Sequence, residues 1–174
     1  MLTKDELREF AKNTRKSLDI ETLSKYFCQR LCELEIFKNS QNIMIYYPLK
    51  YELSFLEMLE LAPSKNYYLP KVHNKNLIVC KFDKNSKLEK SSMNILEPCT
   101  KSIIPQELNL VIVPALMADK NNYRLGYGGG FYDRFIENFG QHFKTICAVP
   151  KELFIENLPT ETFDKTIDLV LVGE

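Results

Sequence analysis

Four of the six glycines of this chain lie within five residues, in the segment Arg124-Leu125-Gly126-Tyr127-Gly128-Gly129-Gly130-Phe131-Tyr132-Asp133-Arg134. At glycine, a backbone N–H group can approach a ligand without a Cβ in the way. Successive N–H groups that turn inward form a nest that binds anions. Arginines flank these glycines, and the carboxylate of Asp133 follows them. Nest, guanidinium and carboxylate together suit a polyphosphate with its Mg²⁺.

A glycine cluster taken alone is just as typical of a flexible surface turn. Flexible linkers pair glycine with serine, whereas this segment contains Tyr127, Phe131 and Tyr132, which favours an ordered loop. We expect a helix from Phe131 to Asn138, whose N-terminus would add to an anion site. The segment is not a Walker A loop, and Phe131 stands where the dinucleotide fingerprint has its third glycine.

Further elements can be predicted from caps and apolar patterns. Thr3 and Glu6 form a capping box, which predicts a helix that begins at Lys4. Its basic stripe of Lys4, Arg8, Lys12 and Arg15 is typical of a solvated face. We expect further helices over residues 21–34 and 55–61, and strands over residues 42–46, 66–69, 77–82, 110–113, 145–149 and 168–172.

The segment Leu110-Val111-Ile112-Val113 is apolar throughout, which indicates a strand covered on both faces. Strands alternate with helices, so we predict an α/β fold with a three-layer arrangement: an open, Rossmann-like, mostly parallel sheet flanked by helices. The 174 residues suit one domain, residues 1–174. In such sheets ligands bind beyond the carboxyl ends of the strands, and the chain leads from Val113 into the glycine segment.

The composition narrows the class of partner. The 23 basic and 23 acidic residues cancel, which argues against a nucleic-acid or membrane-surface binder because these usually carry a basic excess. Five scattered cysteines without metal-type spacing, and an N-terminus without an apolar signal core, favour a cytoplasmic protein. We expect a monomer with small-molecule substrates.

The order of several short motifs resembles a known family. Val113-Pro114, Asp119 and the glycine segment resemble the signature of the 5-formyltetrahydrofolate cyclo-ligase (5,10-methenyltetrahydrofolate synthetase) family. The N-terminal helix is also similar, as are Tyr46-Tyr47-Pro48 with Glu52, Leu69-Pro70-Lys71-Val72, Glu97-Pro98, Asp164 and Asp168. The chain departs from the family pattern at Ala115, Ala118, Asn121-Asn122 and Pro150-Lys151-Glu152.

The resemblance implies an ATP-dependent ligase that forms a C–N bond. Such an enzyme closes the N5-formyl group of 5-formyltetrahydrofolate onto N10, and ATP is hydrolysed to ADP and phosphate under Mg²⁺. A formamide oxygen leaves poorly, so transfer of the γ-phosphoryl group to it would give a phosphorylated formyl intermediate that N10 can attack. Phosphoryl transfer asks the protein mainly for positioning and charge stabilisation.

Roles follow for individual residues. The catalytic candidates are Arg124, Lys4 and Arg8. The candidates for ATP and phosphate binding are Lys4, Arg8, Arg124, Leu125, Gly126, Tyr127, Gly128, Gly129, Gly130, Phe131 and Tyr132. The candidates for folate binding are Tyr47, Glu52, Tyr127, Gly128, Gly129, Gly130 and Phe131, and those for Mg²⁺ are Asp133 and Asp164.

Each role has a structural alternative. Arg124 could be a surface residue, Asp133 a helix cap and Asp164 part of a surface loop. The tyrosines could belong to the core, and Asp119 could be catalytic or form a turn. Two other functions stay open: a sugar-phosphate- or CoA-handling α/β enzyme, and a non-catalytic nucleotide- or folate-binding module.

Overall fold

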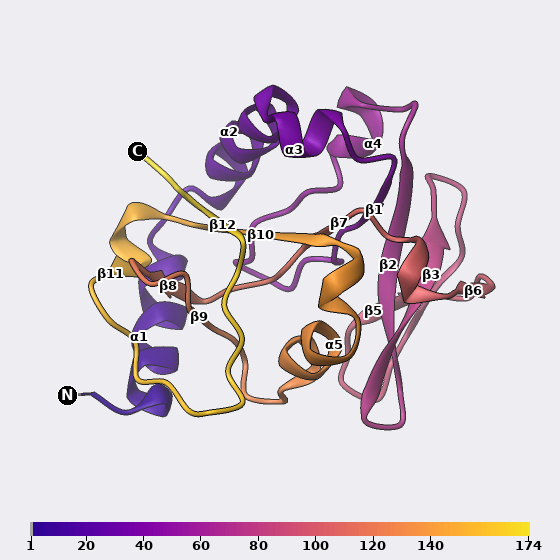
Figure 1. Cartoon of the computed structure of the whole chain (residues 1–174). Coiled ribbons are helices and arrows are strands. Elements are labelled where there is room, and N and C mark those ends of the chain that lie inside the picture. Colours follow the sequence, from indigo (N-terminus) through magenta and orange to yellow (C-terminus); the bar gives the residue numbers. More distant parts are fainter. Residues whose placement is uncertain (1) are drawn as a thin grey trace.

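The computed structural model describes residues 2–174 and is built around one seven-stranded sheet. Its strands stand in the order β12 (Leu169–Val172), β10 (Lys144–Val149), β7 (Leu110–Ile112), β1 (Asn42–Met44), β2 (Asn66–His73), β3 (Asn76–Phe82) and β6 (Ser102–Ile103). The first five are parallel, and β3 and β6 join antiparallel. The predicted α/β class with a mostly parallel sheet is therefore confirmed (Figure 1).

Helices cover both faces of the sheet. On one face lie α2 (Ile20–Glu33), α3 (Glu35–Lys38) and α4 (Met58–Leu61), and on the other lie α1 (Lys4–Lys16) and α5 (Phe131–Phe139) (Figure 1). The central strands serve both layers because successive side chains point to opposite faces.

β1 shows this alternation clearly. Ile43 and Ile45 pack with the first layer of helices, whereas Met44 packs with the second. Burial of each such side chain stabilises the fold by roughly 1.5–3 kcal/mol. Strands covered on both faces are apolar at every position, which explains the unbroken run from Leu110 to Val113.

Helix α1 begins where its capping box predicts. The Thr3 hydroxyl accepts a hydrogen bond from the Glu6 N–H, and the Glu6 carboxylate accepts one from the Thr3 N–H at 2.7 Å. Leu7 and Ala11 face the core. The expectation of a solvated basic stripe is wrong at Arg15, whose side chain is buried beside them.

Several expected boundaries also differ. Strand β2 runs on to His73 because it forms an antiparallel hairpin with β3, and Asn74 provides the left-handed turn residue with φ of 56°. Helix α4 begins only at Met58. The short elements not predicted are α3, β4 (Leu88–Lys90), β5 (Leu96–Pro98), β6, β8 (Met117–Asp119), β9 (Arg124–Leu125), β11 (Phe154–Ile155) and the 3₁₀ turns Pro105–Glu107, Gly140–His142 and Lys151–Leu153.

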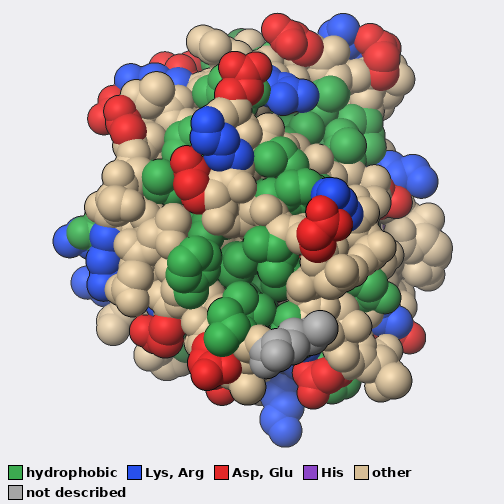
Figure 2. Space-filling view, turned by 90° about the vertical axis from the view of Figure 1, so that its left-hand side faces the viewer, with side chains coloured by type: hydrophobic (Ala, Val, Ile, Leu, Met, Phe, Trp, Pro, Cys, Tyr) green, Lys and Arg blue, Asp and Glu red, His purple; other side chains and the backbone are tan. Residues whose placement is uncertain are grey.

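Charges of both signs are interspersed over the face shown in Figure 2, with hydrophobic side chains between them. None of the helices within residues 2–174 is both long and apolar enough to cross a membrane.

All five cysteines are free thiols, and burial raises the pKa of Cys28 and Cys147 to about 12. These two buried thiols therefore stay protonated near neutral pH and have no nucleophilic character.

Candidate active site

One cavity of about 650 Å³ gathers the predicted site residues. Its wall combines the first turns of α1, the loop after β1, the β2–β3 hairpin, β5, the glycine segment and the loop before β12. Around it lie Lys4, Arg8, Tyr47, Glu52, Arg124, Leu125, Gly126, Tyr127, Gly128, Gly129, Gly130, Phe131, Tyr132, Asp133 and Asp164. Residues from distant parts of the sequence thus meet at one place, and their roles stay predictions.

The glycine segment forms the turn between β9 and α5. Gly128 and Gly130 have φ angles of +108° and +68°, a region that L side chains rarely adopt. A Cβ on Gly129 would lie 2.7 Å from the Phe131 ring. Within the described residues, no hydrogen bond uses the N–H groups from Gly128 to Asp133. These donors include the first turn of a nine-residue helix, where the helix dipole favours an anion.

Arg124 lies beside these donors in β9, and its side chain is only 5% exposed. Its guanidinium stands over the Tyr132 ring at 5.6 Å, and Nη2 lies 3.8 Å from Oδ2 of Asp133. Nε is buried and has no hydrogen-bond partner among residues 2–174. A buried donor without a partner costs stability, and an anion that entered the cavity would supply the missing acceptor.

Two further cations come from consecutive turns of α1. Lys4 Nζ contacts Oδ2 of Asp164 at 2.6 Å and Oε2 of Glu161 at 2.7 Å. Burial alone would lower the pKa of Lys4, but hydrogen bonds and charge from these two carboxylates outweigh it and raise the pKa. Arg8 donates from Nε to the Gly126 carbonyl at 2.9 Å, which ties α1 to the glycine segment.

The two candidate metal ligands differ in how fully they are engaged. Oδ1 of Asp133 accepts the Lys165 N–H at 3.1 Å, and Oδ2 faces Arg124. Oδ2 of Asp164 accepts from both Lys4 and the Glu161 N–H. Residues 2–174 hold no group of three or more acidic, histidine or cysteine side chains arranged for a metal. The donor set fits Mg²⁺ held by one or two carboxylates together with substrate phosphates.

The cavity lining also contains the buried carboxylate of Glu52, from the loop after β1. Glu52 is 8% exposed, and its Oε2 accepts the Leu49 N–H at 2.6 Å. Burial raises the pKa of Glu52, while the Leu49 N–H, the Tyr127 hydroxyl and the charge of Arg15 oppose this rise. Tyr46 is buried against Phe55, so plain core packing explains its ring.

Comparisons with known proteins show the family of this chain. Residues 2–173 match the 5-formyltetrahydrofolate cyclo-ligase family. The chain belongs to that family.

Individual relatives support the match. The chain is 30% identical over 145 residues to the 5-formyltetrahydrofolate cyclo-ligase of Haemophilus influenzae, covering 78% of each chain. It is 33% identical over 115 residues to that of Escherichia coli K12, covering 62% of this chain and 63% of the relative. The solved 5,10-methenyltetrahydrofolate synthetase of Aquifex aeolicus superposes with a TM-score of 0.85 at 26% identity, covering 98% of this chain and 90% of that one. The chain is accordingly a ligase of the cyclo-ligase family.

The cyclo-ligase cavity also has an apolar wall that sequence reasoning missed. Met93, Ile95 and Leu96 come from the β4–β5 hairpin, and Phe163 comes from the loop before β12. Met93 and Phe163 are exposed, although both are large and apolar. Such surface suits the aromatic parts of a ligand. The sequence signals near this wall were the markers Glu97-Pro98 and Asp164.

Asp119 lies outside the cavity lining, and its environment shows a turn-forming role. Its side chain is 1% exposed and accepts the N–H groups of Asn121 and Tyr123 at 2.9 Å and that of Leu158 at 2.8 Å. The carboxylate therefore fixes the β8–β9 turn and joins it to the segment after β11.

We predict that Asp119→Asn lowers stability without changing the chemistry. The side-chain amide of asparagine has only one oxygen, so its NH₂ group would face one of the three backbone N–H groups that Asp119 accepts. This clash of two donors should lower the free energy of unfolding by about 2 kcal/mol. The melting temperature should fall by roughly 4–8 °C, while kcat at 25 °C stays within twofold of the parent. A large loss of kcat in a fully folded variant would contradict the turn-forming role.

Proposed function

We propose that the chain catalyses the ATP-dependent closure of 5-formyltetrahydrofolate to 5,10-methenyltetrahydrofolate, with release of ADP and phosphate. The observation that carries this proposal is that Arg124 lies beside the free N–H groups from Gly128 to Asp133. The Nε of Arg124 is buried and also has no partner within the described residues. Both face the same cavity. Their geometry suits the phosphates of ATP, and family membership supports the folate substrate.

The protein positions two substrates and stabilises charge. The first-turn N–H groups of α5 and the guanidinium of Arg124 bind the β- and γ-phosphates. Lys4 and Arg8 approach from α1, which the Arg8–Gly126 hydrogen bond holds against the loop. Because Lys4 is held by Asp164 and Glu161, ATP must share or replace one of these ion pairs.

The chemical steps balance as follows. The formyl oxygen attacks the γ-phosphorus, the bond to ADP breaks, and an N5 iminium carrying a phosphate ester forms. N10 then attacks the formyl carbon and loses its proton, and the C–O bond to phosphate breaks. The product is the five-membered amidinium ring of the methenyl folate. Charge accumulates on the phosphoryl oxygens during transfer, where preorganised cations and N–H groups act most strongly.

Mg²⁺ would be held by Asp133, with Asp164 as the second candidate ligand, and would offset the charge of the phosphates. The described cavity wall carries six carboxylates but only three cationic side chains. A polyphosphate would therefore meet net negative charge without a divalent cation. This excess of carboxylates supports Mg²⁺ as part of the substrate complex.

The folate end of the cavity is the wall that carries Glu52. A carboxylate there would accept hydrogen bonds from the N–H groups of the pterin ring. Tyr47 and Tyr127 would pack on the ring, and the apolar wall around Met93 and Phe163 offers surface for the remaining aromatic parts.

One assay tests the proposed function. The purified protein is incubated with 5-formyltetrahydrofolate, ATP and Mg²⁺, and the methenyl chromophore and ADP are measured. We expect product only when all three are present, with one ADP for each methenyl folate. Product without ADP would contradict the phosphorylated intermediate. Binding of ATP or folate without turnover would indicate a non-catalytic module, and turnover of a phosphate or CoA substrate without ATP would indicate a different enzyme.

Monomeric state, cytoplasmic location and lack of nucleic-acid or membrane partners stay predictions.

A further inference from the structure

Arg15 is a buried arginine to which the reaction described above assigns no task. It belongs to the last turn of α1, yet its side chain is 2% exposed. Nη2 donates to the carbonyls of Ala115 at 2.6 Å and Leu116 at 3.2 Å, and Nη1 donates to that of Tyr51 at 3.4 Å. Nε is buried and has no partner within the described chain.

These carbonyls lie on two segments that build the active site. Ala115 and Leu116 lead from β7 towards β9 and the glycine segment, and Tyr51 directly precedes Glu52. The third connected piece is α1 itself, which carries Lys4 and Arg8. One guanidinium therefore joins the ATP side of the cavity to the loop on its folate side.

The loop needs such support because its backbone is strained. Tyr51 has φ of 66°, an uncommon value for a bulky residue. Conformations of this kind persist only where surrounding contacts hold them.

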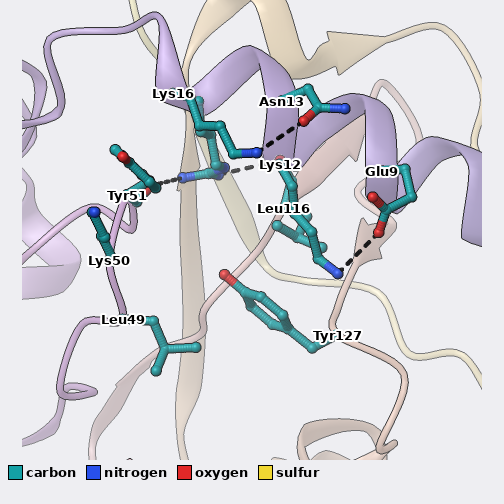
Figure 3. Close-up of a pocket in the computed structure, with 10 residues that line it drawn as sticks. Glu9, Lys12, Asn13, Lys16, Leu49, Lys50, Tyr51, Leu116 and Tyr127 are labelled. Carbon is teal, nitrogen blue, oxygen red and sulfur yellow. Dashed lines mark hydrogen bonds and ion pairs between the residues drawn. The ribbon is translucent and has the colours of Figure 1, made fainter.

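Figure 3 shows Tyr51, Leu116 and Tyr127 around a smaller cavity of about 260 Å³ beside the active site, with Lys12 and Lys16 of α1 on its rim. Leu49 and Tyr127 border both cavities.

Charge links Arg15 to Glu52 as well. The groups that face this carboxylate are the Leu49 N–H from its own loop, Tyr127 from the glycine segment and Arg15 from α1. The charge of Glu52 also raises the pKa of Tyr46 and Tyr132. Burial raises the pKa of all three tyrosines, so they stay neutral near pH 7. The Leu49 N–H and the Tyr127 hydroxyl oppose protonation of Glu52 more strongly, and the positive charge of Arg15 adds to their effect on its pKa.

We propose that Arg15 is a positioning residue for folate: it fixes the loop that carries Glu52 and adds positive charge that helps this buried carboxylate to act as an acceptor for the pterin N–H groups. The inference rests on the proposed function. Arg15 acts through Glu52 and does not touch the substrates.

The test compares Arg15→Met and Arg15→Lys with the control Lys16→Met, which removes an exposed cation from the next position of the same helix. KM for 5-formyltetrahydrofolate, KM for ATP and kcat are measured from pH 5.5 to 8.5. In Arg15→Met we expect the folate KM to rise roughly tenfold or more, as loss of hydrogen bonds to a charged group predicts. The ATP KM should change less than threefold, and Lys16→Met should match the parent.

The pH profile separates positioning from plain structural damage. Loss of Arg15 removes a cause that lowers the pKa of Glu52, so this pKa should rise. The fall of kcat/KM for folate on the acid side should then begin at a higher pH in Arg15→Met. Arg15→Lys keeps the charge but not the planar set of donors, so its KM should rise without this shift. If Arg15→Met does not fold, the lysine variant still tests the loop contact through its folate KM.

A double variant distinguishes the possible outcomes. In a Glu52→Gln background, Arg15→Met should add less than twofold to the folate KM because its target is already lost. Full additivity, equal effects on ATP and folate, or an unchanged pH profile would overturn the inference. Failure of the parent protein to form methenyl folate would instead contradict the proposed function.

Discussion

Arg124→Ala is expected to lower kcat by roughly 10²–10³-fold, as loss of a preorganised charge-stabilising group typically does. The guanidinium is 5% exposed, has an unpartnered Nε and lies beside the free N–H groups of the glycine segment. In the proposed function it binds an anion, and we expect it to contribute little to the stability of the free protein. For this reason we expect the melting temperature to change by less than about 5 °C. The measurement is single-turnover formation of methenyl folate together with thermal unfolding.

Arg30→Ala provides a matched control. Arg30 also stands over a tyrosine ring, that of Tyr26 at 5.8 Å, but it lies on α2, outside the described cavity lining. Its variant should retain parental kcat. Parental activity in Arg124→Ala would show that Arg124 has no part in the reaction, and an unfolded protein would show that it is a structural residue.

The sequence predicted those parts of the fold whose signals are local. The capping box of Thr3 and Glu6 marks the start of α1, and the apolar run at Leu110 marks a strand buried on both faces. The direction of β3 has no such local signature, although Asn74 between two β-rich runs is a turn signal. Strands of two or three residues such as β9 and β11 show no periodicity, and β11 pairs with a strand far away in the sequence.

The candidate site could likewise be predicted only where its signals are local in the sequence. Its glycine segment is contiguous, so residue types together with the family resemblance could predict a phosphate-binding loop there. Arg15 was misjudged because helical spacing placed it on the basic stripe of α1, and only the carbonyls of Tyr51, Ala115 and Leu116 explain its burial. Those partners come from two loops whose approach to α1 depends on the assembled sheet.

Asp133→Asn is the second change for which we expect a large effect. In the structure, Oδ1 accepts the Lys165 N–H, a bond that an asparagine oxygen can preserve, while Oδ2 faces Arg124 and the cavity. Asparagine has nearly the same size but lacks the charge that Mg²⁺ requires. Stability should therefore be retained, while kcat falls on the order of 10²-fold and the Mg²⁺ concentration for half-maximal rate rises.

The deciding measurement is an Mg²⁺ titration of the rate at saturating ATP for the parent, Asp133→Asn and Asp164→Asn. Asp164 already holds Lys4 and the Glu161 N–H, so its variant should lose ATP affinity more than Mg²⁺ affinity. A right-shifted Mg²⁺ curve in Asp133→Asn alone would assign the metal to Asp133. Equal curves for the parent and Asp133→Asn would exclude it, because a carboxylate that only supports the Lys165 backbone has no reason to alter the response to a cation. A shift confined to Asp164→Asn would assign the metal to Asp164, next to the Lys4 ion pair.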